Sequence, residues 1–184
     1  MAKRITIAVL FLLFRPGPPA AHPTTLAQMN LRELALHAVY VARVRCRNTT
    51  TSADSNLVWT LTTFEVTEAW KGEPPPRFTI RLPGGEAAGR RVAVEGAPRF
   101  AIGEEVVLFL EPARGSYMNI VSWAQGTFRV RRNPRTGTEE AMQDTAGLSL
   151  QEPQAGKFSE GSRRSFTLAQ LRSAVARAVA ESGR

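Results

Sequence analysis

Few residues of this 184-residue chain are of the types that carry chemistry, and their spacing favours no catalytic site. The chain has one cysteine, Cys46, and two histidines, His22 and His37. A zinc site needs three or four closely spaced His, Cys or carboxylate ligands, which these residues do not supply. A serine-type triad needs a histidine beside its nucleophile, whereas His37 falls at the end of a predicted short helix, where a cationic side chain suits the helix dipole. We therefore expect no metal site and no catalytic residue.

Two carboxylate pairs and one glycine-rich segment also fail as sites. Glu104-Glu105 and Glu139-Glu140 are direct neighbours, and neighbours in a strand point to opposite faces, so neither pair suits acid–base catalysis. We expect them to be solvated turn residues. The glycine-rich segment 83–89 fits neither a phosphate loop nor a dinucleotide fingerprint, since no helix is predicted after it. The sequence therefore predicts no enzyme and no cofactor.

Cys46 belongs to a predicted strand. A single cysteine allows no internal disulfide, so stability must come from packing. In residues 39–47, Cys46 shares its face with Tyr40, Ala42 and Val44, while arginines continue the other face. We expect Cys46 to be a small core residue rather than a nucleophile.

The N-terminus has the pattern of a secretory signal peptide. Lys3 and Arg4 precede ten uncharged residues, 5–14, and Arg15 with Pro-Gly-Pro-Pro ends the run. A membrane-spanning helix needs about 20 apolar residues, so this run is too short to anchor. We expect residues 1–21 to be removed near Ala21, leaving an exported protein, periplasmic or secreted, with no membrane span. The alternative is a buried N-terminal strand of a cytosolic protein.

Cleavage changes the charge but leaves a full domain. Removing residues 1–21 removes three positive charges, Lys3, Arg4 and Arg15, and lowers the net charge from +8 to +5. The remaining chain of about 163 residues has the length of one domain.

The remaining residues predict a mainly β domain over 22–143. Asn30 and Glu33 have capping-box spacing and predict a short helix before the first strand. Strand-like runs separated by turn residues then follow at the spacing of a barrel or sandwich. Within the run 57–67 the large apolar residues change parity between Leu61 and Phe64, which predicts a one-residue bulge or a sharp bend near Thr62. The predicted strands are 39–47, 57–67, 78–82, 91–94, 106–110, 117–123 and a hairpin around 133–137.

The last part of the chain changes character. Residues 144–165 are rich in Ser, Gly, Gln and Pro, which predicts a flexible linker or flap. Thr167 and Gln170 form a second capping box and open an amphipathic helix over 166–183. Its apolar stripe has three possible partners: the domain itself, another protein or a membrane surface.

The order of these elements resembles a known family. A short helix, a long strand ending in Trp70-Lys71-Gly72, and Gly103-Glu104-Glu105 before the apolar strand 106–110 resemble exported bacterial proteins related to the netrin-like domain. That module also occurs in tissue inhibitors of metalloproteinases. Over residues 38–130 the resemblance implies a small OB-like β-barrel, and the helices predicted above add a short N-terminal helix before it and a C-terminal amphipathic helix after it. The inhibitors chelate a protease metal through an N-terminal cysteine, whereas Cys46 is alone and internal, so no inhibitory residue carries over.

Two functions fit this pattern. The first is a non-catalytic binding module that holds a protein partner, such as an exported protease, through the 84–103 loop, since small barrels bind at loop faces. The second is a basic binder of an anionic envelope polymer, suggested by the net charge and by interleaved Arg and aromatic residues over 123–135. Export argues against nucleic acid. The candidate partner-binding residues are Arg91, Arg99, Phe100, Arg129 and Arg131.

Overall fold

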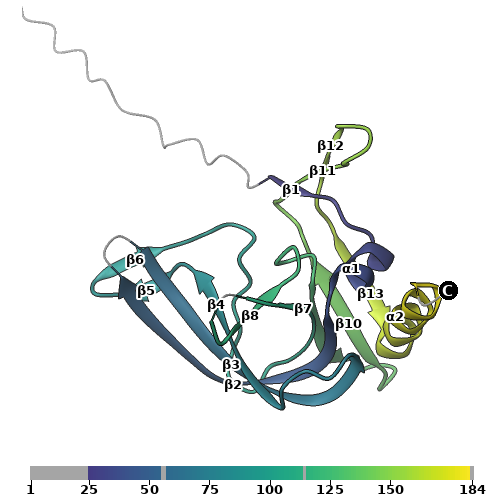
Figure 1. Ribbon diagram of the computed structural model, residues 1–184, viewed down its shortest axis with the longest axis horizontal. Coiled ribbons are helices and arrows are strands. Elements are labelled where there is room, and N and C mark those ends of the chain that lie inside the picture. The colour runs from purple at the N-terminus through teal and green to yellow at the C-terminus, as the bar shows by residue number, and fades with distance from the viewer. Residues whose placement is uncertain (1–24, 55–56, 114, 183–184) are drawn as a thin grey trace, which may run out of the picture.

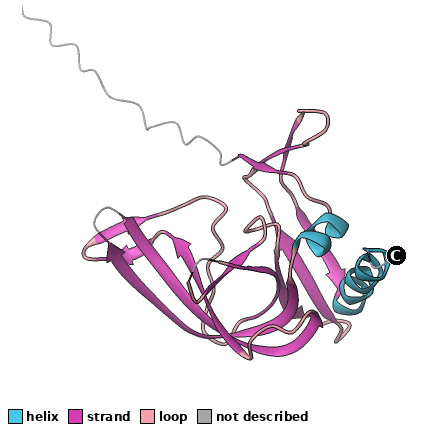
Figure 2. Ribbon diagram, in the orientation of Figure 1, coloured by secondary structure: helices cyan, strands magenta, loops and turns pink. Residues whose placement is uncertain are grey.

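The computed structural model describes residues 25–54, 57–113 and 115–182, which form a mainly β structure with two helices (Figures 1 and 2). The expected signal peptide and its cleavage near Ala21 lie outside the described residues. The helices are α1 (Leu31–His37) and α2 (Leu168–Ser182). The strands are β1 (Thr25–Ala27), β2 (Tyr40–Asp54), β3 (Leu57–Lys71), β4 (Arg77–Pro83), β5 (Gly85–Ala87), β6 (Arg90–Val92), β7 (Glu105–Pro112), β8 (Tyr117–Ile120), β9 (Thr127–Arg132), β10 (Glu139–Asp144), β11 (Ser149–Gln151), β12 (Phe158–Glu160) and β13 (Arg163–Thr167).

One large mixed sheet organises the molecule. Its eight strands follow the order β13-β10-β9-β7-β2-β3-β4-β8, and β8 also pairs with β7. The β4–β8 pair is parallel, and the other pairs of this sheet are antiparallel. Two small sheets, β1-β11-β12 and β5-β6, complete the fold. The sheet β1-β11-β12 extends away from the large sheet (Figure 1).

The large sheet has a hydrophobic core on each face, because successive side chains along a strand point to opposite faces. On β2, Ala42, Val44 and Cys46 belong to the core on the concave face, while Val41 faces the helices. Residues 106–110 of β7 are all fully buried and alternate between the two cores. This confirms Cys46 as a core residue and β7 as a strand covered on both faces.

Both predicted capping boxes are present. The Asn30 side chain accepts a hydrogen bond from the Glu33 backbone N–H (2.9 Å), and the Glu33 carboxylate accepts one from the Asn30 N–H (2.7 Å). Thr167 and Gln170 make the same reciprocal bonds at the start of α2. Leu171 and Val175 of α2 are fully buried in the core that α1 shares. The apolar stripe of α2 therefore packs on its own domain, beside α1 (Figure 1).

The predicted bulge near Thr62 is wrong. Val58, Thr60, Thr62 and Phe64 are all buried on one face of β3, so the strand keeps its parity. Thr60 can face the core because its hydroxyl donates a hydrogen bond to the Gly84 carbonyl oxygen (2.7 Å). This bond satisfies the hydroxyl, a polar group that the alternation of apolar residues had predicted on the exposed face. The irregularity nearest Thr62 lies on the neighbouring strand, between Cys46 and Asn48. Two further register shifts, in which β3 carries the extra residue, lie opposite Val41–Ala42 and Arg43–Val44.

The segment 144–165 differs from the expected linker or flap. It contains β11, β12 and the start of β13, and β13 forms the outer strand of the large sheet beside β10. Backbone hydrogen bonds order this segment, and its buried large apolar side chains, Leu148 and Leu150, are too few for its composition to reveal the strands. Among the described residues, no helix combines the length and the apolar character needed to cross a bilayer.

Candidate binding site

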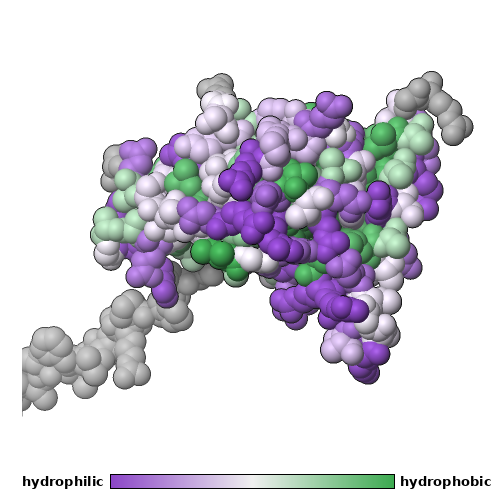
Figure 3. Space-filling model, turned by 90° about the horizontal axis from the view of Figure 1, so that it is seen from below, coloured by the Kyte–Doolittle hydropathy of each residue, from purple (hydrophilic) through white to green (hydrophobic). Residues whose placement is uncertain are grey.

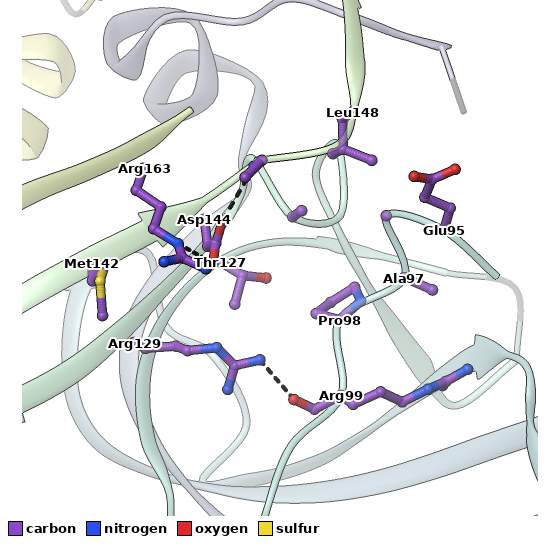
Figure 4. Close-up of a pocket in the computed structure, with 13 residues that line it drawn as sticks. Glu95, Ala97, Pro98, Arg99, Thr127, Arg129, Met142, Asp144, Leu148 and Arg163 are labelled. Carbon is purple, nitrogen blue, oxygen red and sulfur yellow. Dashed lines mark hydrogen bonds and ion pairs between the residues drawn. The ribbon is translucent and has the colours of Figure 1, made fainter. Parts of the chain in front are cut away.

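A pocket of about 310 Å³ lies where the loop 95–99 passes over strands β9 and β10 (Figure 4). The loop contributes Ala97 and Pro98, and the segment after β10 contributes Leu148. Thr127, Arg129, Met142 and Asp144 come from the two strands, and Arg163 from β13. The residues at 127 and 129 share one face of β9, because strand side chains alternate. The opposite face carries Phe128, which is buried against the helices.

Arg129 fastens the loop to β9. Its Nη2 donates to the Arg99 carbonyl oxygen (2.8 Å), and its Nη1 pairs with the Glu104 carboxylate. The guanidinium carbon lies 5.7 Å from the centre of the Phe100 ring. Because both ends of the segment 99–104 are bound to one guanidinium, this wall of the pocket is held in place without a regular strand.

A second ion pair forms the opposite wall. Arg163 Nε donates to Asp144 Oδ2 (2.8 Å), and the Ala146 N–H donates to Oδ1 (3.1 Å). Burial raises the pKa of Asp144, but the hydrogen bonds from Arg163 and Ala146 and the charges of Arg163 and Arg129 outweigh it and lower the pKa below its ordinary value. The carboxylate is therefore ionised at neutral pH, and the pocket presents charges of both signs beside the apolar side chains of Pro98, Met142 and Leu148.

The structure separates the five candidate partner-binding residues. Arg99 and Arg129 line the pocket. Phe100 does not suit a partner contact, because it is 7% exposed and packs edge-on against Phe64 with ring centres 4.9 Å apart. Arg91 lies outside the pocket on β6, exposed and paired with Glu86 (2.9 Å). Arg131 is exposed on β9, beyond the residues that line the pocket.

Arg99 contributes its backbone to the pocket and directs its side chain away from it (Figure 4). Its Nη2 donates to the Pro83 carbonyl oxygen (2.7 Å), and its Nη1 is buried with no hydrogen-bond partner among the described residues. Burial lowers the pKa of Arg99. The guanidinium therefore secures the loop to the end of β4, a role that the sequence did not reveal.

The sequence did not predict four residues that line the pocket, namely Met142, Asp144, Leu148 and Arg163. Asp144 and Arg163 stand at the two ends of the predicted linker, and only the register of β10 with β13 places them opposite each other. Their opposite charges are the one signal in the sequence that could have paired them.

The arginines of β2 form a network on the convex face rather than a free basic patch. Arg43 bonds to Glu139 (2.6 Å) and to Glu105 (3.0 Å), and Arg45 also pairs with Glu105. The hydrogen bonding of the Arg43 guanidinium to the Glu139 carboxylate, which accepts, is the main reason that the pKa of Arg43 is raised. Glu104 and Glu105 are thus not solvated turn residues, since their side chains are 19% and 20% exposed and ion-paired.

Seen from below, hydrophilic residues cover most of the surface, with small separate hydrophobic areas (Figure 3).

Glu105 is expected to make the free energy of unfolding fall as the pH becomes acidic. Hydrogen bonds from Arg45 and Arg43, with their charges, lower its pKa despite the opposing effect of burial. Its contribution to stability is therefore complete above the ordinary carboxyl pKa of about 4.3 and is lost as the pH falls through the lowered value. We expect Glu105→Gln to be less stable than the unchanged protein at pH 7 and to lose less further stability on acidification. Urea unfolding at pH 7, 4 and 3 measures this, and parallel losses in both proteins would contradict it.

Metal binding has no support from the described ranges, which contain no group of three His, Cys, Asp or Glu side chains able to hold an ion. Cys46 is fully buried, and His37 is an exposed residue at the end of α1.

Comparison of the chain with protein-family models, with curated proteins and with solved structures finds no match in any of the three.

Proposed function

We propose that this protein is an exported, non-catalytic binding module that holds a segment of a protein partner in the pocket beside Arg129. The observation that carries the proposal is the pocket itself, in which a loop fixed by Arg129 and the Arg163–Asp144 pair enclose apolar side chains. Binding sites of this kind are mostly apolar with a few fixed polar groups that orient the ligand. A peptide segment with an apolar side chain between polar backbone groups matches this lining.

The strand pairings support an OB-like barrel as the scaffold. Strands β7, β2, β3, β4 and β8 pair in succession, and β8 pairs again with β7, so the pairings form a ring. An OB-fold is a five-stranded Greek-key barrel whose loops and one sheet face carry the binding surface. On this inference the loop 84–104, between β4 and β7, is a barrel loop, and the pocket lies where this loop meets the strands outside the ring.

A protein partner is favoured over an anionic polymer by the state of the arginines. Polymer binding of the salt-dependent kind needs free cationic side chains that neutralise anionic groups. The three outward arginines of β2 are each paired with glutamate, and so is Arg129. A polymer that used these four arginines would have to compete with their carboxylates, whereas a ligand of the pocket would not. Within 123–135 the arginines without an ion pair to another described residue are Arg131, Arg132 and Arg135, which are exposed.

Filling the pocket is expected to weaken partner binding at least about tenfold. Ala146 is an exposed residue of the pocket lining, so Ala146→Trp occupies the pocket without disturbing a core. Ala176→Trp on the exposed side of α2 is the matched control. With a C-terminal tag in the native host, we expect one protein to co-purify with the unchanged chain and with Ala176→Trp at both low and high salt. With Ala146→Trp we expect the yield of the co-purified partner to be at least tenfold lower, which corresponds to a loss of about 1.4 kcal/mol or more of binding free energy.

Other outcomes of this experiment contradict the proposal. Equal recovery with Ala146→Trp would place the interface elsewhere. Retention on polyanions at low salt alone would support the polymer binder. Recovery of the tagged protein from the cytosol would refute export.

A further inference from the structure

The hairpin β2–β3 extends beyond the strand that covers its other side. Strand β2 pairs with β7 only from Tyr40 to Arg45, and Cys46 makes the last bonds on that side, to Glu104 and Gly103. Its pairing with β3 continues to Asp54. Residues 47–54 therefore form a strand edge with no neighbouring strand among the described residues, and seven of these eight residues are exposed, Thr49 being intermediate.

The direction of the backbone groups along this edge follows from the pairing of β3. The Gly84 N–H donates to the Val58 carbonyl oxygen, so even-numbered residues of β3 turn their backbone toward β4 and odd-numbered ones toward β2. Trp59, Leu61 and Thr63 pair with Ser52, Thr50 and Asn48. The N–H and C=O groups of the alternate residues, Thr49, Thr51 and Ala53, consequently point away from the sheet and are free to pair.

This edge carries none of the usual protection against pairing. Native sheets shield exposed edges with lysine, proline, charges or a covering segment. Residues 48–53 read Asn-Thr-Thr-Thr-Ser-Ala and contain neither charge nor proline. The Thr51 hydroxyl donates to the Glu86 carbonyl oxygen of β5 (2.6 Å), which fastens the inner side of the edge to a second element. The edge is thus both regular and fixed in position.

We propose that this edge pairs with the same edge of a second copy of the chain, antiparallel and centred on Thr51. In that register Thr51 lies opposite the partner's Thr51, and Thr49 lies opposite the partner's Ala53. Each residue whose backbone N–H and C=O point away from its own sheet therefore lies opposite a residue of the same kind. Such pairs exchange two hydrogen bonds each. Thr50 then lies opposite the partner's Ser52 on the exposed face.

The charges at the two ends of the edge also match. Arg47, which is paired with Glu65, stands at one end, and Asp54, 4.0 Å from Arg81, stands at the other. Antiparallel pairing brings the Arg47 end of one copy beside the Asp54 end of the other, so no like charges meet, and residues 48–53 between them carry no charge. The contact is smaller than the interface of about 1,600 Å² typical of stable complexes. The dimer is therefore weak, with a dissociation constant on the order of 100 µM.

Charge placement at positions 50 and 52 tests the register. Both side chains are exposed, so substitution spares the core. In Thr50→Lys/Ser52→Lys two lysine pairs oppose each other, and we expect at least about tenfold weaker dimerisation, because like charges directly opposite are destabilising. In Thr50→Lys/Ser52→Glu each lysine faces a glutamate, and dimerisation equals or exceeds that of the unchanged protein. Ser173→Lys/Ala176→Lys on α2 adds the same two charges elsewhere and leaves dimerisation unchanged.

Sedimentation velocity of the full chain from about 10 µM to 1 mM measures the dissociation constants. A monomer at every concentration would overturn the proposal, as would equal dimerisation of the Lys/Lys and Lys/Glu variants. A dimer weakened equally by the α2 variant would show general charge repulsion instead of edge pairing, and would overturn it as well.

Discussion

Replacement of Phe109 with alanine is expected to lower the free energy of unfolding by about 3–5 kcal/mol. Phe109 is fully buried in the middle of β7, and its ring centre lies 5.4 Å from that of Phe128. Removing the ring leaves a cavity between the sheet and the two helices, which neighbouring strands on both sides of β7 cannot close. The loss comes from apolar burial and from packing contacts together.

Guanidinium chloride unfolding monitored by circular dichroism measures this effect. Ile102→Ala is the control, because Ile102 is 68% exposed and its replacement is expected to change stability by no more than about 0.5 kcal/mol. A loss below about 1 kcal/mol in Phe109→Ala would mean that the helices do not depend on this core for their position.

Gln125→Ala is expected to lower the free energy of unfolding by about 1–3 kcal/mol, because a buried side chain that bonds three separate groups is lost. Gln125 is 2% exposed, and its side chain accepts from the Met29 N–H (2.9 Å) and donates to the Ala27 carbonyl oxygen (2.8 Å) and the Ser122 hydroxyl (2.6 Å). Gln125 is buried, whereas its partners are exposed (Ala27) or partly buried (Met29 and Ser122), so truncation removes three hydrogen bonds and leaves the partly buried Met29 N–H without its acceptor.

Two measurements separate this effect from general loss of packing. Denaturant unfolding gives the stability change, with Gln154→Ala in the exposed turn between β11 and β12 as the neutral control. Hydrogen exchange of the Met29 amide should accelerate more than that of amides in β7, since the bond to Gln125 protects it directly. Equal acceleration at both places would contradict a specific role for this side chain.

The elements with strong local signals could be predicted from the sequence. The uninterrupted apolar run 106–110 identified a strand buried on both faces, and the pairs Asn30–Glu33 and Thr167–Gln170 identified both helix starts. These features depend on neighbours within a few residues, where side-chain chemistry and backbone geometry are directly coupled. The position of Cys46 in the core followed from the same local alternation.

What could not be predicted depends on pairing between distant segments. Thr60 and Thr62 face the core because partners from other strands satisfy or enclose them, which alternation of apolar residues does not reveal. The pocket needs β13 beside β10 and the loop 95–99 above them, so only Arg99 and Arg129 of its polar residues were recognised. Phe100 was misassigned because its partner in the core, Phe64, lies 36 positions earlier in the chain.

The contacts of the first described residues set an order of assembly during synthesis. Strand β1 pairs with β11, Met29 binds Gln125 at a separation of 96 positions, and Arg32 pairs with Glu181 at a separation of 149. Each partner is made long after the segment it binds. Residues 25–29 therefore pair only after residues 125–151 are present, and contacts of such long range are slow to form. The first of the described segments in the sequence is thus among the last to reach its final place.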